Sequence, residues 1–445
     1  MRASTLAPVA PSEARPADVL RLAWPIMVSM ASYSIMGLVD SLFVGQLGTS
    51  ALAAVGLATS ATHLACALWI GCLGGVRVLI AQRSGADDLA SARVFAWQGI
   101  WLALLAGALT ACLAPFAPAM LGLFGASGDV VSQGSGYLGV RLVGSTFVFL
   151  VFALQGWFQG RGDTRTPMRA VLAGNLLNVV LDPVLIHGLF GFPALGAAGA
   201  AVATALAFGV QVVWLGVAAS RDLGARVALR WDDLREILRV GLPMGTHFVL
   251  DVASFALFAM LLASVGEAHL AAHVVVVRVL MVSVLPGHAI GEATGVLVGR
   301  ALGGGQPEVA RRSWASGTLV AVAIMSVFGV GFLSVPELLL GPFGVEPDVL
   351  ELGVGVLALA GLVQAFDAVA MVAVGALNGA GDTRFSMVLG LGASWLVKVP
   401  VSVAGVALGF GVVGAWSGVA VELVVLALLA VARVRGGTWL SRGAL

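Results

Sequence analysis

Long apolar runs separated by short polar breaks dominate the chain. About 20 apolar residues suffice to cross the hydrocarbon core of a bilayer as a helix. Twelve runs of at least about this length cover approximately residues 20–44, 50–81, 94–122, 134–158, 168–190, 195–219, 238–263, 269–301, 313–340, 349–377, 385–408 and 412–433. The pattern predicts an all-α membrane protein with twelve transmembrane helices.

The two halves of the chain repeat one another. Residues 160–168 read GRGDTRTPM and residues 379–387 read GAGDTRFSM, so six of nine positions agree at an offset of 219. At an offset of 218, Pro25 falls on Pro243. Six spans return the chain to the same side, so the halves share one orientation. We predict two six-helix bundles related by a pseudo-twofold axis along the membrane normal, as in carriers that use alternating access.

The polar breaks predict the domain boundaries and the orientation. Arginines gather in the tails and the even-numbered loops, while the odd-numbered loops contain none. Loops rich in Lys and Arg stay on the cytoplasmic side of a membrane. We therefore expect a protein of the inner cell membrane with both termini in the cytoplasm. The expected segments are a cytoplasmic tail (1–18), a first bundle (19–219), a cytoplasmic linker (220–237), a second bundle (238–433) and a cytoplasmic tail (434–445).

Composition agrees with a membrane location and excludes several classes of protein. Hydrophobic residues make up 59% of the chain and charged residues 11%, against about 25% charged in soluble proteins. The net charge of +1 does not suggest nucleic acid as a partner. The chain has one lysine, Lys398, and it follows a valine, so no phosphate-binding G-x-x-x-x-G-K-[ST] loop exists. Without C-x-x-C or H-E-x-x-H motifs, we expect no catalytic residue, no metal enzyme and no cofactor.

Acidic residues within the apolar runs are the candidates for function. A charge at the bilayer centre costs at least about 2.5–3.5 kcal/mol, so each needs a partner or a purpose. The six are Asp40, Asp182, Asp251, Glu292, Asp367 and Glu422. A rise of about 1.5 Å per residue places Asp40 and Asp182 at similar depth in the outer half of the first bundle. Tyr137 and Thr204 reach that depth on descending helices, and Asn178 shares a helix face with Asp182.

These five first-bundle residues predict a cation-coupling site. A carboxylate withdrawn from water binds a proton, or binds Na⁺ with help from neutral oxygens. Pro183 frees a backbone carbonyl beside Asp182. Two acids in one apolar bundle repel unless they share a cation, so coupling is favoured over a purely structural network. The expected Na⁺ ligands are Asp40, Asn178 and Asp182, and no other metal is expected.

The second bundle offers a second candidate site at Asp251 and Asp367, for which coupling and structural roles are equally open. Lys398 and Glu422 lie at similar depth and are expected to form a structural ion pair. Arg278 is a candidate partner for either aspartate. Four methionines are candidates for an adaptable substrate cavity, although ordinary packing is favoured for each. They are Met27, Met30, Met36 and Met260.

Several segments together resemble the multidrug and toxic compound extrusion (MATE) family over nearly the whole chain. They are Pro25 followed by GLVDSLFVGQLG around Asp40, QGRGDTRTPM from Gln159, NLLNVVLDPVLI containing Asn178 and Asp182, GAAGAAVAT ending at Thr204, and NGAGDTR from Asn378. The Asn–Asp–Pro run and the two GDTR turns are the most specific of these segments.

The resemblance implies a cation-coupled antiporter that exports organic, often cationic or amphipathic compounds in exchange for H⁺ or Na⁺. In the DinF-like branch of the family, the five first-bundle residues carry the coupling. In the NorM-like branch, acids on the seventh and tenth helices matter, and Asp251 and Asp367 fall near those places. The first-half motifs look more DinF-like. Expected partners are small-molecule substrates and the lipid bilayer, and the protein is expected to be a monomer.

Two other functions remain open from the sequence. A lipid-linked or polysaccharide flippase of the same superfamily needs a basic cavity, for which Arg141, Arg278 and Lys398 are the candidates against six acids. The other function is that of an intramembrane enzyme. The chain contains no G-x-S-x-G or H-E-x-x-H motif that would support it, and an enzyme function does not explain the internal repeat.

Overall fold

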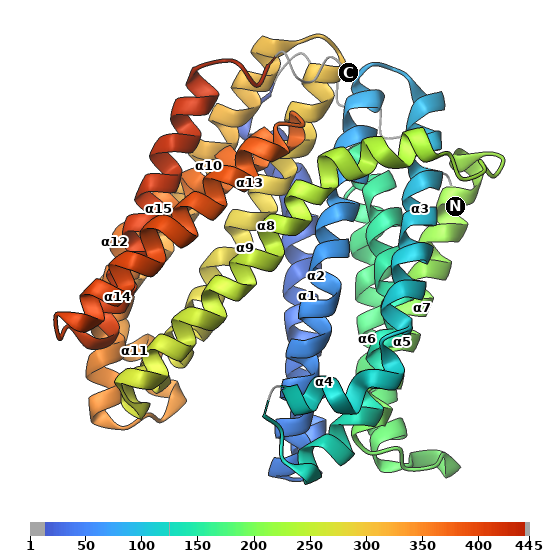
Figure 1. Cartoon of the computed structure of the whole chain (residues 1–445). Helices are drawn as coiled ribbons and strands as arrows, with labels where there is room; N and C mark the ends of the chain where they lie inside the picture. Colours follow the sequence, from blue (N-terminus) through green and yellow to red (C-terminus); the bar gives the residue numbers. More distant parts are fainter. Residues whose placement is uncertain (1–13, 124, 441–445) are drawn as a thin grey trace. The chain divides into compact units, whose positions relative to one another are not determined.

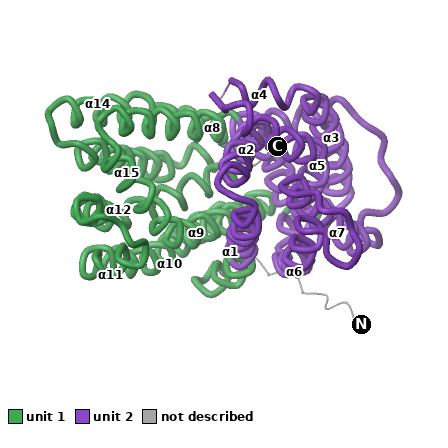
Figure 2. Tube along the Cα trace, turned by 90° about the horizontal axis from the view of Figure 1, so that it is seen from below, with its two compact units in different colours: residues 1–27, 85–87, 246–445 green, residues 28–84, 88–245 purple. Residues whose placement is uncertain are grey.

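Every element that the computed structural model describes, over residues 14–123 and 125–440, is helical (Figure 1). Within this part of the chain, 12 helices are long and apolar enough to cross a membrane. The predicted all-α membrane fold is therefore confirmed. The chain divides into two compact units, coloured separately in Figure 2.

The N-terminal unit comprises residues 28–84 and 88–245. Its helices are α1 (Pro16–Gly45, from Val28 on), α2 (Thr49–Gly85), α3 (Leu89–Ala111), η1 (Ala114–Phe116), α4 (Ala117–Leu123), α5 (Gly128–Gly160), α6 (Arg165–His187), η2 (Leu189–Gly191), α7 (Ala197–Leu223) and the start of α8 (Trp231–Val265). Both α5 and α6 pack along α7, and α3 packs along α5. Phe149 and Trp157 of α5 are fully buried in the apolar core between these helices.

The described part of the C-terminal unit comprises residues 14–27, 85–87 and 246–440. Its elements after α8 are α9 (Glu267–Gly303), α10 (Pro307–Ser334), α11 (Pro336–Leu340), η3 (Gly341–Phe343), α12 (Pro347–Gly379), α13 (Thr383–Gly392), η4 (Ala393–Lys398), α14 (Val399–Ala407) and α15 (Gly411–Arg435). The helix α12 packs along α9, α10 and α15. The η4 segment is a π-helical turn, and it carries Lys398.

Two of the predicted spans are interrupted in the structure. The run 94–122 divides between α3 and α4, joined by a 3₁₀ turn with a proline near its start. The run 313–340 divides at Val335, between α10 and α11. Val335 precedes Pro336, and a residue before proline disfavours the helical conformation.

The predicted segment boundaries can be placed on the helices. Between α7, which ends at Leu223, and α8, which begins at Trp231, the chain is not helical. The division between the compact units falls inside α8, after Gly245. Residues 1–13 and 441–445 of the predicted tails lie outside the described residues. The domain limits inferred from the sequence remain predictions.

Close backbone contact joins α9 to α12 in the C-terminal unit. A Cβ atom added to Gly375 would overlap the carbonyl oxygen of Gly291, and one added to Gly379 would overlap that of Gly295. Transmembrane helices associate through such small residues because no side chain keeps the backbones apart. These glycines therefore set the spacing of the two helices.

Candidate functional site

Two carboxyl groups meet inside the N-terminal unit. Asp40 of α1 is 8% exposed and Asp182 of α6 is fully buried, and their carboxyl groups lie close enough for the charge of each to act on the other. The charge of Arg141, which is on α5, also acts on Asp40. Two neighbouring carboxylates cannot both remain charged at low cost, so the pair favours binding a proton or a cation.

Neutral side chains complete this group. Asn178 donates from Nδ2 to Oδ1 of Asp182 at 3.3 Å. The Thr204 hydroxyl lies 3.3 Å from Oδ2 of Asp40 and 2.9 Å from the carbonyl oxygen of Ala200. A hydroxyl has one hydrogen to donate, so Thr204 fully satisfies only one of these two acceptors at a time.

Three oxygen atoms of the group have no hydrogen-bond partner among the described residues. They are Oδ1 of Asp40, Oδ1 of Asn178 and Oδ2 of Asp182, and all three are buried. Buried polar atoms normally have partners. Acceptor oxygens from two carboxylates and an amide are suitable ligands for H⁺ or Na⁺. Within the same described ranges, no cluster of three or more His, Cys, Asp or Glu side chains could hold a metal ion.

Polar contacts fix α1 about two turns before Asp40. The Tyr33 hydroxyl donates to Oε1 of Gln211 on α7 at 2.7 Å. Asn175 of α6 donates from Nδ2 to the Ser32 hydroxyl at 2.7 Å. Sequence reasoning missed these four residues, although each is a polar side chain within an apolar run, which was the available signal. They hold the three site helices in register.

Tyr137 has no hydrogen bond to either carboxylate among the residues that the structure describes. Its side chain is 3% exposed, and its hydroxyl lies 3.3 Å from that of Thr59 on α2, within hydrogen-bond distance. The structure therefore brings together four of the five first-bundle residues and pairs the fifth with another helix. A role for Tyr137 in coupling remains a prediction.

In the C-terminal unit the expected ion pair is confirmed. The Lys398 ammonium lies 3.1 Å from the carboxylate of Glu422 and 3.8 Å from that of Asp251. Lys398, and not the exposed Arg278, therefore neutralises Asp251. Asp367 is 9% exposed and lies near the charge of Glu422. Coupling through Asp251 or Asp367 remains a prediction.

The four candidate methionines differ in their surroundings. Met36 is 8% exposed and belongs to the apolar core, whereas Met260 is 62% exposed. Met27 and Met30 are half-buried. The core position of Met36 agrees with a packing role, and substrate contacts of the other three remain a prediction.

The family is established by comparison with known proteins. The MatE family model matches residues 25–184 and 243–404, which together are more than half of the chain. The two matches begin at Pro25 and Pro243, the positions that the internal repeat relates. The chain belongs to the MatE family, a family of membrane transporters, and it is therefore a multi-pass membrane transporter and not an enzyme.

Individual proteins agree with this assignment. The chain is 30% identical over 439 residues to the probable multidrug resistance protein NorM of Thermotoga maritima, covering 96% of this chain and 94% of that protein. It is 31% identical over 454 residues to the protein of the same name from Deinococcus radiodurans, covering 98% and 99%. A crystal structure of MATE in the bent conformation, 24% identical, has the same fold, with a TM-score of 0.88 over 97% of each chain. The predicted family is confirmed, and membership of its DinF-like branch remains a prediction.

Proposed function

We propose that the protein exports organic, often cationic or amphipathic compounds in exchange for H⁺ or Na⁺. Family membership and the multidrug resistance proteins among its relatives support the export of drugs. The ion coupling rests on one observation, the buried pair Asp40–Asp182 with its unpartnered oxygens. No cofactor is required, because the ion gradient supplies the free energy.

The coupling follows from competition for negative charge. A proton or Na⁺ that binds between Asp40 and Asp182 removes the repulsion between the carboxylates, and its departure restores it. The bound and free states therefore favour different arrangements of α1 and α6, and a ligand that binds one arrangement better shifts the equilibrium. Pro25 in α1 and Pro183 in α6 lack a backbone N–H, which lowers the cost of bending these helices. Alternating access of the two bundles would then carry substrate outward.

The same proposal includes the placement of the protein in the inner membrane as a monomer with both termini in the cytoplasm. The support for this orientation is the distribution of arginines, which concentrate in the even-numbered loops and tails.

A flippase for anionic lipid-linked compounds has less support. Of its three basic candidates, Lys398 is neutralised by Glu422, and the charge of Arg141 acts on Asp40. Only Arg278 has no acidic partner in the described part of the chain. Compensated charges do not make a cavity for anionic headgroups.

Transport in proteoliposomes tests the proposal. Efflux of a fluorescent cationic dye is measured under separately imposed H⁺ and Na⁺ gradients for wild type, Asp40→Asn, Asp182→Asn and the control Asp129→Asn. Asp129 is an exposed acid of the same unit. We expect one gradient to drive efflux in wild type and the control, and neither to drive it in the Asp40 and Asp182 variants. Undiminished efflux by folded Asp40→Asn would contradict the proposal.

A further inference from the structure

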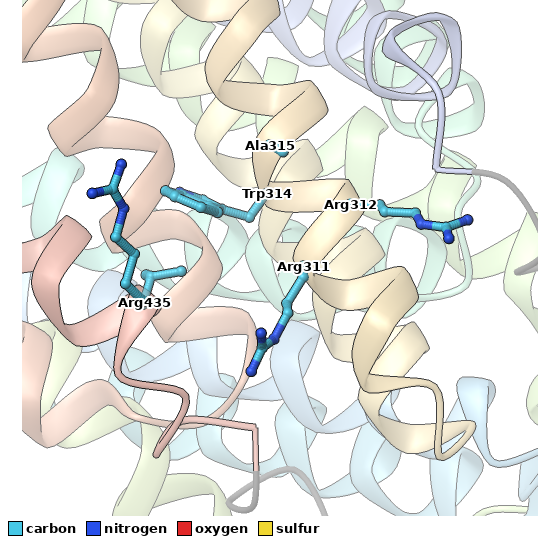
Figure 3. A pocket seen from close by; sticks show the side chains of 6 residues that line it. Arg311, Arg312, Trp314, Ala315 and Arg435 are labelled. Atoms are coloured by element: carbon cyan, nitrogen blue, oxygen red, sulfur yellow. The ribbon is translucent and has the colours of Figure 1, made fainter.

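A basic pocket lies in the C-terminal unit where α10 begins and α15 ends (Figure 3). Its volume is about 340 Å³, within the range of small-ligand sites. The residues that line it, which define the basic pocket below, are Arg311, Arg312, Trp314, Ala315, Val434 and Arg435. The ion-coupling site uses none of them.

The arginines of the basic pocket are poorly neutralised. Arg311 lies 3.9 Å from Glu308, a separation at the limit of an ion pair, and the Glu308 side chain is 75% exposed. The side chains of Arg312 and Arg435 have no ion pair or hydrogen bond with any residue that the structure describes. Exposed pairs of this kind contribute little, so the pocket carries a net positive charge.

A neighbouring arginine shows the contrast. Arg433, two residues before Arg435, lies 2.8 Å from the buried carboxylate of Asp382 and over the ring of Phe385. The ion pair between Arg433 and Asp382 joins the end of α15 to the turn before α13. The charges of the basic pocket have no comparable structural task.

The walls of the pocket suit an amphipathic ligand. The indole ring of Trp314 extends from α10 toward Arg435 of α15, and Arg311 lies on the same helix as Trp314 (Figure 3). Arg312 projects from the other side of α10 (Figure 3). Trp314, Ala315 and Val434 supply apolar surface beside the guanidinium groups. A ligand with one anionic group and an apolar body matches this arrangement.

The position along the helices indicates the membrane interface. Arg311 and Trp314 lie in the first turns of α10, and Arg435 is the last residue of α15. Both helices are candidate spans, so the pocket lies at span ends. Tryptophan is enriched at that depth, and basic pockets between transmembrane helices bind anionic lipid headgroups.

We propose that the basic pocket binds the phosphate headgroup of an anionic phospholipid from the surrounding membrane. Arg435, which lies beside Trp314 (Figure 3), contacts the phosphate with the paired donors of its guanidinium group, Arg311 adds positive charge to the pocket, and Trp314 packs against the glycerol and the first acyl carbons. The proposal goes beyond transport and does not depend on which ion drives it.

Lipid titration of the purified full chain tests this site. Native mass spectrometry in a neutral detergent gives the affinity for phosphatidylglycerol, with phosphatidylcholine as the uncharged comparison. We expect Arg311→Gln/Arg435→Gln to lower the affinity for phosphatidylglycerol about tenfold or more. The control Arg169→Gln/Arg235→Gln removes the same charge from exposed positions of the N-terminal unit and is expected to leave the affinity within about twofold.

Three outcomes would overturn the proposal. They are equal affinity of wild type for the two lipids, an equal loss in the control variant, and displacement of phosphatidylglycerol by millimolar inorganic phosphate, which would indicate a free-anion site. If the double variant does not fold, the single change Arg435→Gln at the exposed end of α15 serves in its place, and unchanged affinity there would equally reject the site.

Discussion

The ammonium group of Lys398 lies 3.1 Å from the carboxylate of Glu422, and the lysine side chain is 1% exposed. Asp251 lies 3.8 Å from the same ammonium, and the centre of the Phe255 ring lies 4.4 Å from it. The one lysine of the chain therefore contacts two carboxylates and an aromatic face.

Removing one charge of the Lys398–Glu422 pair should destabilise the protein more than removing both charges. Glu422→Gln leaves a buried ammonium with only the more distant Asp251, and breaking a buried pair typically costs about 3–5 kcal/mol. We expect a clear fall in the unfolding temperature in detergent. Lys398→Met/Glu422→Gln, which removes both charges, should recover most of the loss. A double variant as unstable as Glu422→Gln would show that the charge pair is not the cause.

The Thr204 hydroxyl should contribute to ion affinity. Thr204→Val removes the group 3.3 Å from Asp40, and a hydrogen bond to a charged group contributes about 1.5–3 kcal/mol. We expect the concentration of the driving ion at half-maximal efflux to rise about tenfold or more. Thr204→Ser keeps the hydroxyl and should stay close to wild type. Equal behaviour of the two variants would remove Thr204 from the site.

The glycine contact between α9 and α12 should not tolerate a methyl group. Gly375→Ala places a Cβ on the carbonyl oxygen of Gly291, and overpacking costs about 1–3 kcal/mol. Gly331→Ala in α10 meets no atom within 4 Å and should be neutral or stabilising by up to about 1 kcal/mol. Thermal unfolding of the two variants compares them directly. Similar midpoints for both would mean that the helices can separate at no cost.

Cysteine labelling should report the orientation. In a background with Cys66, Cys72 and Cys112 changed to Ala, Asp129→Cys and Asp232→Cys each place one thiol at an exposed position. A membrane-impermeant maleimide added to intact spheroplasts should label Asp129→Cys but not Asp232→Cys. After lysis it should label Asp232→Cys as well. The reverse pattern would place the termini outside the cytoplasm.

The hydropathy pattern and the depth of each residue along its helix predicted much of the architecture. They did not predict how far each helix is rotated about its own axis. Counting residues placed Asp40, Asp182, Tyr137 and Thr204 at one depth, but depth is a single coordinate. The rotation of α5 about its axis decides that the hydroxyl of Tyr137 meets Thr59. No apolar pattern reveals that rotation when every face of a helix is apolar.

Long-range pairings were also beyond the sequence. Arg278 and Lys398 were both candidates to neutralise an acid of the second bundle, and packing selected Lys398 for Asp251. The basic pocket is lined by residues near Arg311 and by residues near Arg435, which lie far apart in the sequence on two different helices. The arginines there read as orientation signals in the sequence, and only their shared cavity suggests a ligand.

The π-helical turn Ala393–Lys398 makes the position of a charge depend on the number of residues before it. A π turn accommodates one residue more than an α turn, and one residue corresponds to about 100° of rotation around a helix. Deleting a single residue from this turn would let it close as an ordinary α turn and leave Lys398 facing Glu422, whereas inserting one would rotate Lys398 away by about that angle. The span should therefore tolerate a deletion at this turn better than an insertion.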